Sequence, residues 1–383
     1  MYRIAFKMLT EDKAKYIGML LSLSLSAMII TQQAGIFIGL MRRTYSSISD
    51  TAQPDIWVMD TSVRMIDDSS PMRYNELFRV RSIKGVAWAV PFFRGQIRAR
   101  LLDGTFQMCN FIGIDDASLI GGPPVMLEGK ITDLRRPHAI IVDEVGAGDK
   151  LAKMVGTTKV PLKIGDTLEI NDQRAYVVGI CKVVRTFRSQ PVIYTSYSNA
   201  ISYVPFERKL LSFILVRTDG TVSPQDVCTS ITSRTGLKAL TKKEFEELTI
   251  DYYLVNTGIP INFGLAVLLG LLVGAAIAGQ IFYNFTTDTL KYLALFRVMG
   301  ASRWLLAKMT LIQALWLALL GWLIGSGAAA LLAIATSNTE LSFHYPWQLF
   351  IGTGLLMVGI CISASLVSIR RIYGIELASV FKQ

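Results

Sequence analysis

The sequence has few of the residues from which catalytic and metal centres are usually built. It contains only two histidines, His138 and His344, which lie far apart in the chain, and it lacks the motifs H-E-x-x-H, G-x-S-x-G and G-x-x-x-x-G-K-[ST]. These absences argue against a zinc hydrolase, a serine hydrolase and an ATP-binding P-loop in this chain. Three acidic pairs, Asp67–Asp68, Asp115–Asp116 and Asp143–Glu144, lie near Gly, Pro or Ser, and we expect them in solvated turns. We therefore predict no catalytic, cofactor-binding or metal-binding residues.

Cysteine is also scarce. The four cysteines, Cys109, Cys181, Cys228 and Cys361, form no C-x-x-C spacing, and three of them fall in the same long segment. Because three thiols cannot pair evenly, we expect buried free thiols, with one disulfide in this segment as the alternative.

Charge is absent from four long stretches of the chain. Tyr16–Met41, Gly258–Thr287, Met309–Thr339 and Leu341–Ile369 contain no Asp, Glu, Lys or Arg, in a chain that is 51% hydrophobic with a mean hydropathy of +0.42. Each stretch exceeds the ~20 residues that a helix needs to cross the hydrocarbon layer. We predict four transmembrane helices rather than a cleaved signal peptide at the first stretch, because that run is too long and no A-x-A site follows.

The predicted organisation follows from these stretches. It comprises an amphipathic arm at 1–15, a first span at 16–41, an α+β domain at 42–257 that has one or two subdomains, a second span at 258–284, a loop at 285–304, a third span at 305–336, a short loop at 337–346, a fourth span at 347–369 and a tail at 370–383.

The basic residues near the span ends predict the orientation. The arm carries Arg3, Lys7, Lys13 and Lys15, the loop at 285–304 and the start of the third span carry Lys291, Arg297, Arg303 and Lys308, and the tail carries Arg370, Arg371 and Lys382. By the positive-inside rule, both termini and this loop face the cytoplasm, and the large domain lies outside. Arg42–Arg43 is a local exception. Most of the net charge of +10 thus reflects the orientation of the spans in the membrane, and we expect no nucleic-acid partner.

The pattern of residues 42–257 predicts an α+β domain. We expect strands at Asp55–Met59, Gln96–Leu102, Thr105–Ile114, Thr167–Ile170, Ala175–Val184 and Phe213–Arg217, with turns at Asp103–Gly104 and Asn171–Asp172, and helices at Tyr74–Ser82 and Thr241–Leu254. The second helix should lead into the second span and join the domain to it rigidly. Gly121–Pro124 indicates either a subdomain boundary or a surface turn.

Two pairs of glycines have a spacing that permits close helix packing. Gly270 and Gly274 lie in the second span, and Gly321 and Gly325 lie in the third. The partner helix lies either in the same subunit or in a second copy.

The most specific stretch is the loop Asp288–Arg303. Apolar side chains on one side of a short helix are followed by Gly300-Ala301-Ser302, which suits a helix C-cap and a turn back into the membrane. The alternative is an amphipathic helix that rests on the lipid surface.

At this point the sequence resembles a family, the permeases of the MacB/FtsX type of ABC transporter, and most closely the DevC-like exporter permeases without a fused ATPase. The family loop E-x-A-x-L-[KR]-[AV]-[MI]-G-[AY]-[ST] is matched by Ala294, Phe296, Arg297, Val298, Met299, Gly300, Ala301 and Ser302, although Tyr292 replaces the usual acid. The tail Arg370–Phe381 and the segments Gly113–Asp115 and Gly122–Pro124 add weaker matches, with Leu377 in place of a proline.

The resemblance implies a coupling helix that contacts an ATPase. Its residues are Lys291, Tyr292, Leu293, Leu295, Phe296, Arg297, Met299, Gly300, Ala301 and Ser302. It also implies two copies of an ABC ATPase subunit, which bind the ATP and magnesium, a second copy of this permease, a periplasmic adaptor, an outer-membrane exit duct and surrounding membrane lipids.

The expected function is therefore that of a non-catalytic, multi-pass subunit of the bacterial inner membrane, which transmits ATPase movements to its periplasmic domain for export. The alternatives are an FtsX-like signal transducer that regulates periplasmic cell-wall enzymes, and a membrane-anchored enzyme, for which no motif was found.

Overall fold

The computed structural model describes residues 2–101, 103–155, 158–204, 211–336, 339 and 341–373. The chain forms two compact units. One consists of Met1–Leu40 and Gly258–Gln383, and the other of Met41–Thr257. We call them the membrane unit and the outer domain.

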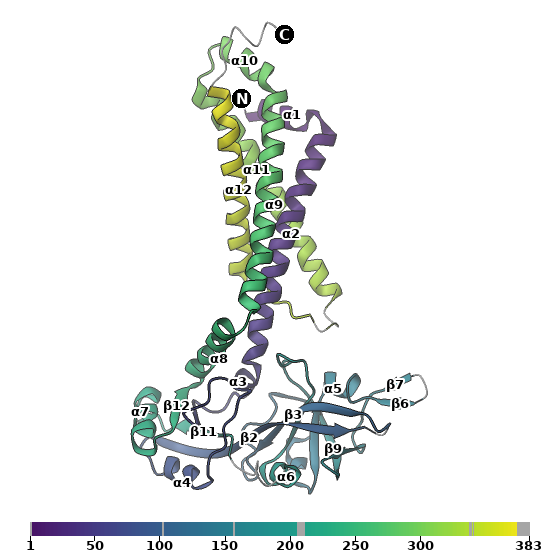
Figure 1. Ribbon diagram of the computed structural model, residues 1–383, viewed down its shortest axis with the longest axis vertical. Helices are drawn as coiled ribbons and strands as arrows, with labels where there is room; N and C mark the ends of the chain where they lie inside the picture. Colours follow the sequence, from purple (N-terminus) through teal and green to yellow (C-terminus); the bar gives the residue numbers. More distant parts are fainter. Residues whose placement is uncertain are drawn as a thin grey trace. The chain divides into compact units, whose positions relative to one another are not determined.

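The membrane unit is entirely helical in its described part (Figure 1). Its helices are α1 (Tyr2–Glu11), α2 (Lys13–Thr44), α9 (Ile259–Asp288), α10 (Leu290–Val298), α11 (Arg303–Ala335) and α12 (Trp347–Tyr373). Four of them, α2, α9, α11 and α12, are long and apolar enough to cross a membrane. The prediction of one N-terminal and three C-terminal spans around an α+β domain is therefore confirmed.

Helix α2 continues beyond both ends of the predicted first span, because it begins at Lys13 and ends at Thr44. A helix satisfies its own backbone hydrogen bonds, so it does not have to stop at the edge of the hydrocarbon layer. The core of the membrane unit lies where α2 meets α9, α11 and α12. Its fully buried side chains include Leu23 and Ala27 from α2, Phe282 from α9 and Leu317 from α11.

The outer domain is built on one mixed sheet. The strands are β1 (Ile56–Met59), β2 (Val86–Arg100), β3 (Phe106–Ile114), β4 (Val125–Gly129), β5 (Ala139–Asp143), β8 (Thr167–Ile170), β9 (Gln173–Lys182), β10 (Val192–Ser196), β11 (Phe213–Thr218) and β12 (Lys238–Thr241), with a separate hairpin of β6 (Lys153–Val155) and β7 (Thr158–Val160). The helical elements are α3 (Ser46–Asp50), α4 (Asn75–Arg81), η1 (Ile131–Arg135), α5 (Glu144–Gly148), α6 (Tyr197–Tyr203), α7 (Pro224–Thr235) and α8 (Lys242–Asn256).

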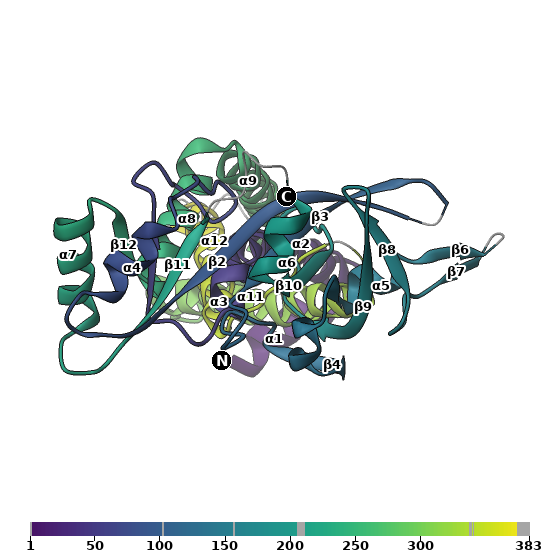
Figure 2. The ribbon, with the colours of Figure 1, turned by 90° about the horizontal axis from the view of Figure 1, so that it is seen from below.

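Strand β2 runs through both halves of this sheet (Figure 2). The strand order is β12-β1-β11-β2-β3-β10-β5-β9-β4, with β8 beside β2 and β9. Up to Phe92, β2 pairs with β11, and from Phe93 onward it pairs with β3. One continuous strand thus joins the two halves, and of the two alternatives for Gly121–Pro124 the structure shows the turn. This segment is a turn before β4, in which Gly121 has a φ of +92°.

Side chains alternate between the two faces of the sheet and fill a core on each. On β1, Ile56 and Val58 point into the core that α4, α6 and α7 cover, while Trp57 and Met59 point into the core shared with α3 and α8. The ring of Trp57 lies 5.4–5.6 Å from the rings of Phe92, Phe213 and Phe245. Aromatic rings at this spacing stabilise a core beyond the area that they bury.

The predicted turns and the second helix are present. Asn171 and Asp172 adopt positive φ values between β8 and β9, as a tight hairpin turn requires. Helix α8 begins with a capping box between Thr241 and Glu244, but it ends at Asn256, and Thr257 is extended. Helix α8 thus precedes the second span directly, as expected, with only Thr257 and Gly258 between it and α9, and the rigid connection stays a prediction.

The four cysteines are buried free thiols. Asp143 also departs from expectation, since it is buried rather than solvated. Its carboxylate caps α5 by accepting from the backbone N–H of Gly146 at 2.8 Å, and it also accepts from the backbone N–H of Val192 on β10 at 2.7 Å. Burial raises the pKa of Asp143.

Candidate functional site

The loop between the second and third spans is a short helix with a well-formed end. Helix α10 ends in the pattern of a Schellman motif. The N–H of Gly300 donates to the carbonyl of Arg297 at 3.1 Å, and the N–H of Ala301 donates to the carbonyl of Phe296 at 3.0 Å. Gly300 takes the left-handed conformation that this motif needs, with a φ of +92°. The sequence prediction of a Gly-Ala-Ser helix end is therefore confirmed.

Ser302 starts the next helix directly. Its hydroxyl accepts from the backbone N–H of Leu305 at 3.2 Å, which caps α11. At the other end, Thr289 closes α9, because its N–H and its hydroxyl both donate to the carbonyl of Phe285. Helix α10 is thus held between two capped spans by very short connections.

One face of α10 is buried in the membrane unit. Leu293 and Ala294 are 5% and 1% exposed, and Leu293 packs in a small core with Ala5, Leu306 and Met309. Phe296 and Ala301 pack against this core and are partly buried. Leu293, a predicted contact residue, is therefore not available to a partner in this conformation.

The opposite face of α10 is exposed and apolar. Tyr292, Leu295, Val298 and Met299 are 49–65% exposed, and Trp304 at the start of α11 is 67% exposed. Val298 and Trp304 were missing from the predicted contact set. Gly300 and Ser302 are exposed, Arg297 is partly buried, and the side chain of Lys291 lies outside the described residues.

Helix α1 forms a second wall beside α10. A groove of about 480 Å³ lies between them and is lined by Lys7, Met8, Thr10, Glu11, Tyr292 and Phe296. Helix α1 is attached to α11 by a contact of the Phe6 and Trp316 rings at 5.1 Å and by a buried hydrogen bond from Gln313. The sequence offered only the amphipathic character of the arm as a sign of this arrangement.

The glycines of the third span lie against α2. A Cβ atom on Gly325 would be 2.3 Å from the carbonyl oxygen of Ser24, and one on Gly321 would be 2.8 Å from Cβ of Leu23. Neither side chain would fit without a shift of the backbone. The close approach of α11 to α2 therefore requires glycine at both positions.

The glycines of the second span also face α2. A Cβ atom on Gly270 would lie 3.2 Å from Ile30, and one on Gly274 would lie 3.0 Å from Ser26. All four glycines therefore serve packing on one central helix of the same chain.

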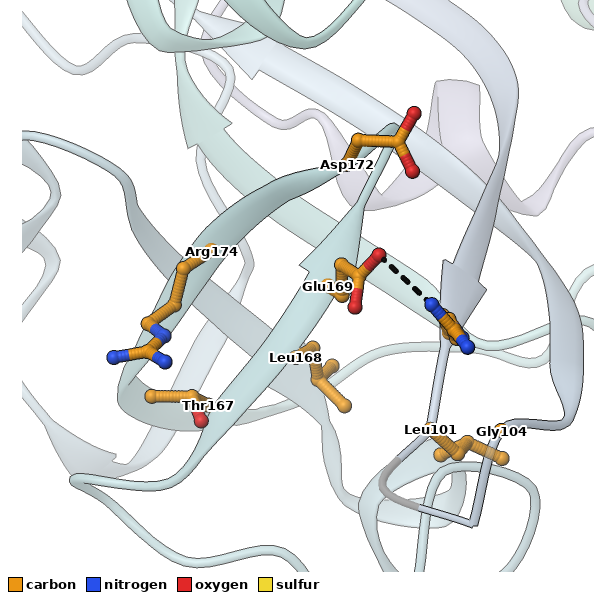
Figure 3. A pocket seen from close by; sticks show the side chains of 8 residues that line it. Leu101, Gly104, Thr167, Leu168, Glu169, Asp172 and Arg174 are labelled. Atoms are coloured by element: carbon orange, nitrogen blue, oxygen red, sulfur yellow. Dashed lines mark hydrogen bonds and ion pairs between the residues drawn. The ribbon is translucent and has the colours of Figure 1, made fainter.

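The outer domain has an open hollow of about 490 Å³ at the end of β2 and the β8–β9 hairpin (Figure 3). Arg100 and Glu169 form an ion pair across it at 3.4 Å, and Asp172 and Arg174 complete its charged lining. Acids and bases are mixed and exposed, so the hollow shows no preference for a ligand of one charge. Among the described residues, no three His, Cys, Asp or Glu side chains are grouped closely enough to hold a metal ion.

Two family descriptions match the chain. Residues 17–234 match the MacB-like periplasmic core domain, and residues 264–377 match the C-terminal region of FtsX-like permeases. No curated protein matches the chain.

The solved structures that are similar to part of the chain include two extracytoplasmic domains. The extracellular domain of the noncanonic ABC-type transporter YknZ from Gram-positive bacteria is 14% identical, with 49% of this chain and 98% of that chain covered and a TM-score of 0.35. The periplasmic region of MacB from Actinobacillus actinomycetemcomitans is 12% identical, with 52% and 94% covered and a TM-score of 0.38.

Proposed function

The chain belongs to the FtsX-like permeases with a MacB-like periplasmic core domain, and on this premise we propose that it is the membrane subunit of an ATP-driven exporter. The family implies a partner ABC ATPase, and this chain is a multi-pass membrane protein with an extracytoplasmic domain. In our proposal, ATP and magnesium bind to the ATPase, and this chain transmits its movement without catalysing a reaction.

The exposed apolar face of α10 carries this proposal. Tyr292, Leu295 and Met299 are large side chains exposed by about half or more, and they follow one another at the i, i+3, i+7 spacing of one helix face. Because one span, α9, separates α10 from the outer domain, this face lies on the cytoplasmic side, where the ATPase is. An apolar helix face of this kind fits a groove on a partner protein.

The connections of α10 favour transmission of force. It is joined to α9 and α11 by the single residue Thr289 and by the four residues Met299–Ser302, with both spans capped at these ends. A force on α10 would therefore be transmitted to both spans, because the segments that connect them are short. Helix α9 follows the outer domain in the chain and α2 precedes it, so this movement reaches the outer domain through two helices.

The spans offer no sign of ion coupling. The four charge-free stretches contain no Asp, Glu, Lys or Arg, whereas proton- and ion-coupled transporters usually keep an ionisable side chain inside the membrane. We propose accordingly that the ATP-driven movement acts at the outer domain, on the outer side of the membrane. A DevC-like assembly would include two ATPases, a second permease, a periplasmic adaptor and an outer-membrane duct, in an inner membrane with both termini in the cytoplasm.

Thiol labelling in cells tests the topology. All four native cysteines are buried, so a cysteine introduced at an exposed position reports that position. We expect Phe106→Cys in the outer domain to react with a membrane-impermeant maleimide once the outer membrane is opened. Met299→Cys should react only after the inner membrane is permeabilised. Labelling of both in the same compartment would remove the physical basis of the coupling.

Affinity purification from detergent tests the assembly. We expect an ABC ATPase among the co-purifying chains, and an adaptor protein if the pump is tripartite. An ATPase without any adaptor would leave the coupling intact and reject the tripartite assembly.

A further inference from the structure

The connection between the third and fourth spans lies against the second half of α2. Residues 341–346 of this connection form neither helix nor strand, and we call them the strap. The backbone N–H of His344 donates to the carbonyl of Gly35 on α2 at 3.1 Å. Both segments belong to the membrane unit. The strap is thus attached to a span that is distant from it in the sequence.

Two glycines of α2, Gly35 and Gly39, make room for the strap. They are about one helical turn apart. A Cβ atom on Gly39 would lie 2.7 Å from the carbonyl carbon of Ser342 and closer still to its oxygen. A Cβ atom on Gly35 would lie 3.0 Å from Cδ1 of Tyr345 and closer still to Cε1. A side chain at Gly39 would therefore displace the backbone of the strap, whereas one at Gly35 would meet a ring that can turn.

Tyr345 connects the strap to three spans. Its ring lies against Gly35 of α2, its hydroxyl donates to the backbone carbonyl of Ala329 on α11 at 3.3 Å, and its ring centroid is 5.9 Å from that of Phe350 on α12. The ring of Phe343 stacks on it at 6.0 Å. One side chain of the strap thus contacts α2, α11 and α12 together.

The strap contacts α2 shortly before this helix enters the outer domain. The outer domain begins at Met41, two residues after Gly39. One span, α11, separates the strap from α10, so the strap lies at the end of the bundle opposite to the candidate ATPase site. Any displacement of the strap would therefore act on the last membrane residues before the outer domain.

We propose that the strap fastens the outer end of α2 to α11 and α12, so that these three spans move together at this end of the bundle. The close contact of α11 with α2 at Gly325 involves Met28, which is seven residues, or roughly 10 Å, before Gly35. The strap adds a second attachment further along α2, and two separated attachments resist tilting of a helix better than one. The proposal rests on contacts inside the membrane unit and does not depend on the exporter role.

Hydrogen exchange of the purified full chain in detergent tests the strap from both sides. We expect Gly39→Ala, which displaces the strap, to speed exchange in residues 341–346 by about tenfold or more, because a hydrogen bond and its packing are lost. Tyr345→Ala changes only the strap, and it should also speed exchange in residues 33–40 of α2. A loop that merely rests on α2 would not have this second effect.

Each variant has a matched control. Gly18→Ala adds the same methyl group to α2 where nothing lies within 4 Å, and Ile351→Ala removes an exposed side chain from α12. Both should exchange like the wild-type chain. Unchanged exchange of the strap in Gly39→Ala, or of α2 in Tyr345→Ala, would overturn the proposal. Faster exchange throughout the membrane unit would also overturn it, because it would indicate general destabilisation.

Two milder variants keep the test decisive if a stronger one fails to fold. Gly35→Ala meets the ring of Tyr345 rather than backbone, and it should speed exchange of the strap to a smaller extent than Gly39→Ala. Tyr345→Phe keeps the ring and removes only the hydrogen bond to Ala329. It should still speed exchange in residues 33–40, and wild-type exchange in both milder variants would reject the fastening.

Discussion

Gln313 and Ala5 form a buried hydrogen bond that attaches the N-terminal helix to a span. Nε2 of Gln313 on α11 donates to the backbone carbonyl of Ala5 on α1 at 2.7 Å, and Gln313 is only 5% exposed. A buried amide without a partner is costly, so this bond gives α1 one preferred position. Because α1 lines the groove beside α10, the bond also determines the shape of the candidate ATPase site.

We predict that Gln313→Leu loosens α1. Loss of the hydrogen bond should cost about 1 kcal/mol and speed hydrogen exchange in residues 2–11. Gln280→Leu is the control, because Gln280 is an exposed glutamine on α9. Equal exchange of α1 in the wild-type chain and in Gln313→Leu would show that the Phe6–Trp316 contact alone holds the helix.

We predict that Gly325→Ala destabilises the membrane unit, while Gly327→Ala does not. A Cβ on Gly325 would meet Ser24 and Ala27 of α2, whereas one on Gly327 has nothing within 4 Å. Overpacking of this kind costs about 1–3 kcal/mol. Thermal unfolding of the two purified variants in detergent gives the comparison, and equal midpoints would contradict the close packing of α11 on α2.

We predict that Leu295→Asp and Met299→Asp uncouple the protein from its ATPase. A charge placed in an apolar contact should weaken binding by at least about tenfold. The measurement is co-purification with the ATPase and stimulation of its activity, in variants shown to insert normally. Phe296→Asp tests the partly buried edge of the same helix.

The control for these variants is Phe78→Asp, which changes a side chain of similar exposure in the outer domain. It should leave ATPase binding unchanged. Normal stimulation by Met299→Asp would reject α10 as the coupling helix, and equal loss in Phe78→Asp would indicate a general defect.

We predict a pH-dependent effect of Asp50→Asn. Burial raises the pKa of Asp50 above its usual 3.8, so the folded state binds the proton more tightly than the unfolded state. The resulting stabilisation is complete below about pH 3.8 and is lost as the pH rises through the raised pKa. Asparagine remains neutral and still offers an oxygen to the N–H of Val184.

The unfolding midpoint of Asp50→Asn minus that of the wild-type chain should therefore increase from acidic toward neutral pH. Unfolding midpoints of the two purified proteins, measured across the acidic to neutral pH range, provide the test. A difference that falls with pH would mean that Lys242 and Arg42 stabilise the ionised carboxylate more than burial destabilises it.

Several features of the fold were predictable because they depend on local sequence. The apolar run Ile56–Met59, the turn residues Asn171–Asp172 and the start of the helix at Thr241 each act within a few residues, and each has its expected structure. The helix end at Gly300 belongs to the same class. The environment of Asp143 was not predictable, because its burial depends on Val192, which comes from a distant strand.

The sequence predicted which segment forms the candidate site, but not which of its side chains are exposed. The sequence located α10 and its apolar side chains. Only the packing of α1 and α11 decided that Leu293 is buried while Val298 and Trp304 are exposed. Periodicity shows that a helix has an apolar face, but it does not show which neighbour covers that face.

The sequence by itself determined the four spans, because the hydrocarbon layer sets a condition on contiguous residues: about 20 without charge. The tertiary structure alone decided that β2 serves both halves of the sheet, that four glycines meet α2, and that Arg43 and Ser189, 146 residues apart, are in contact. Such contacts depend on the folded path of the whole chain, and no local pattern encodes them.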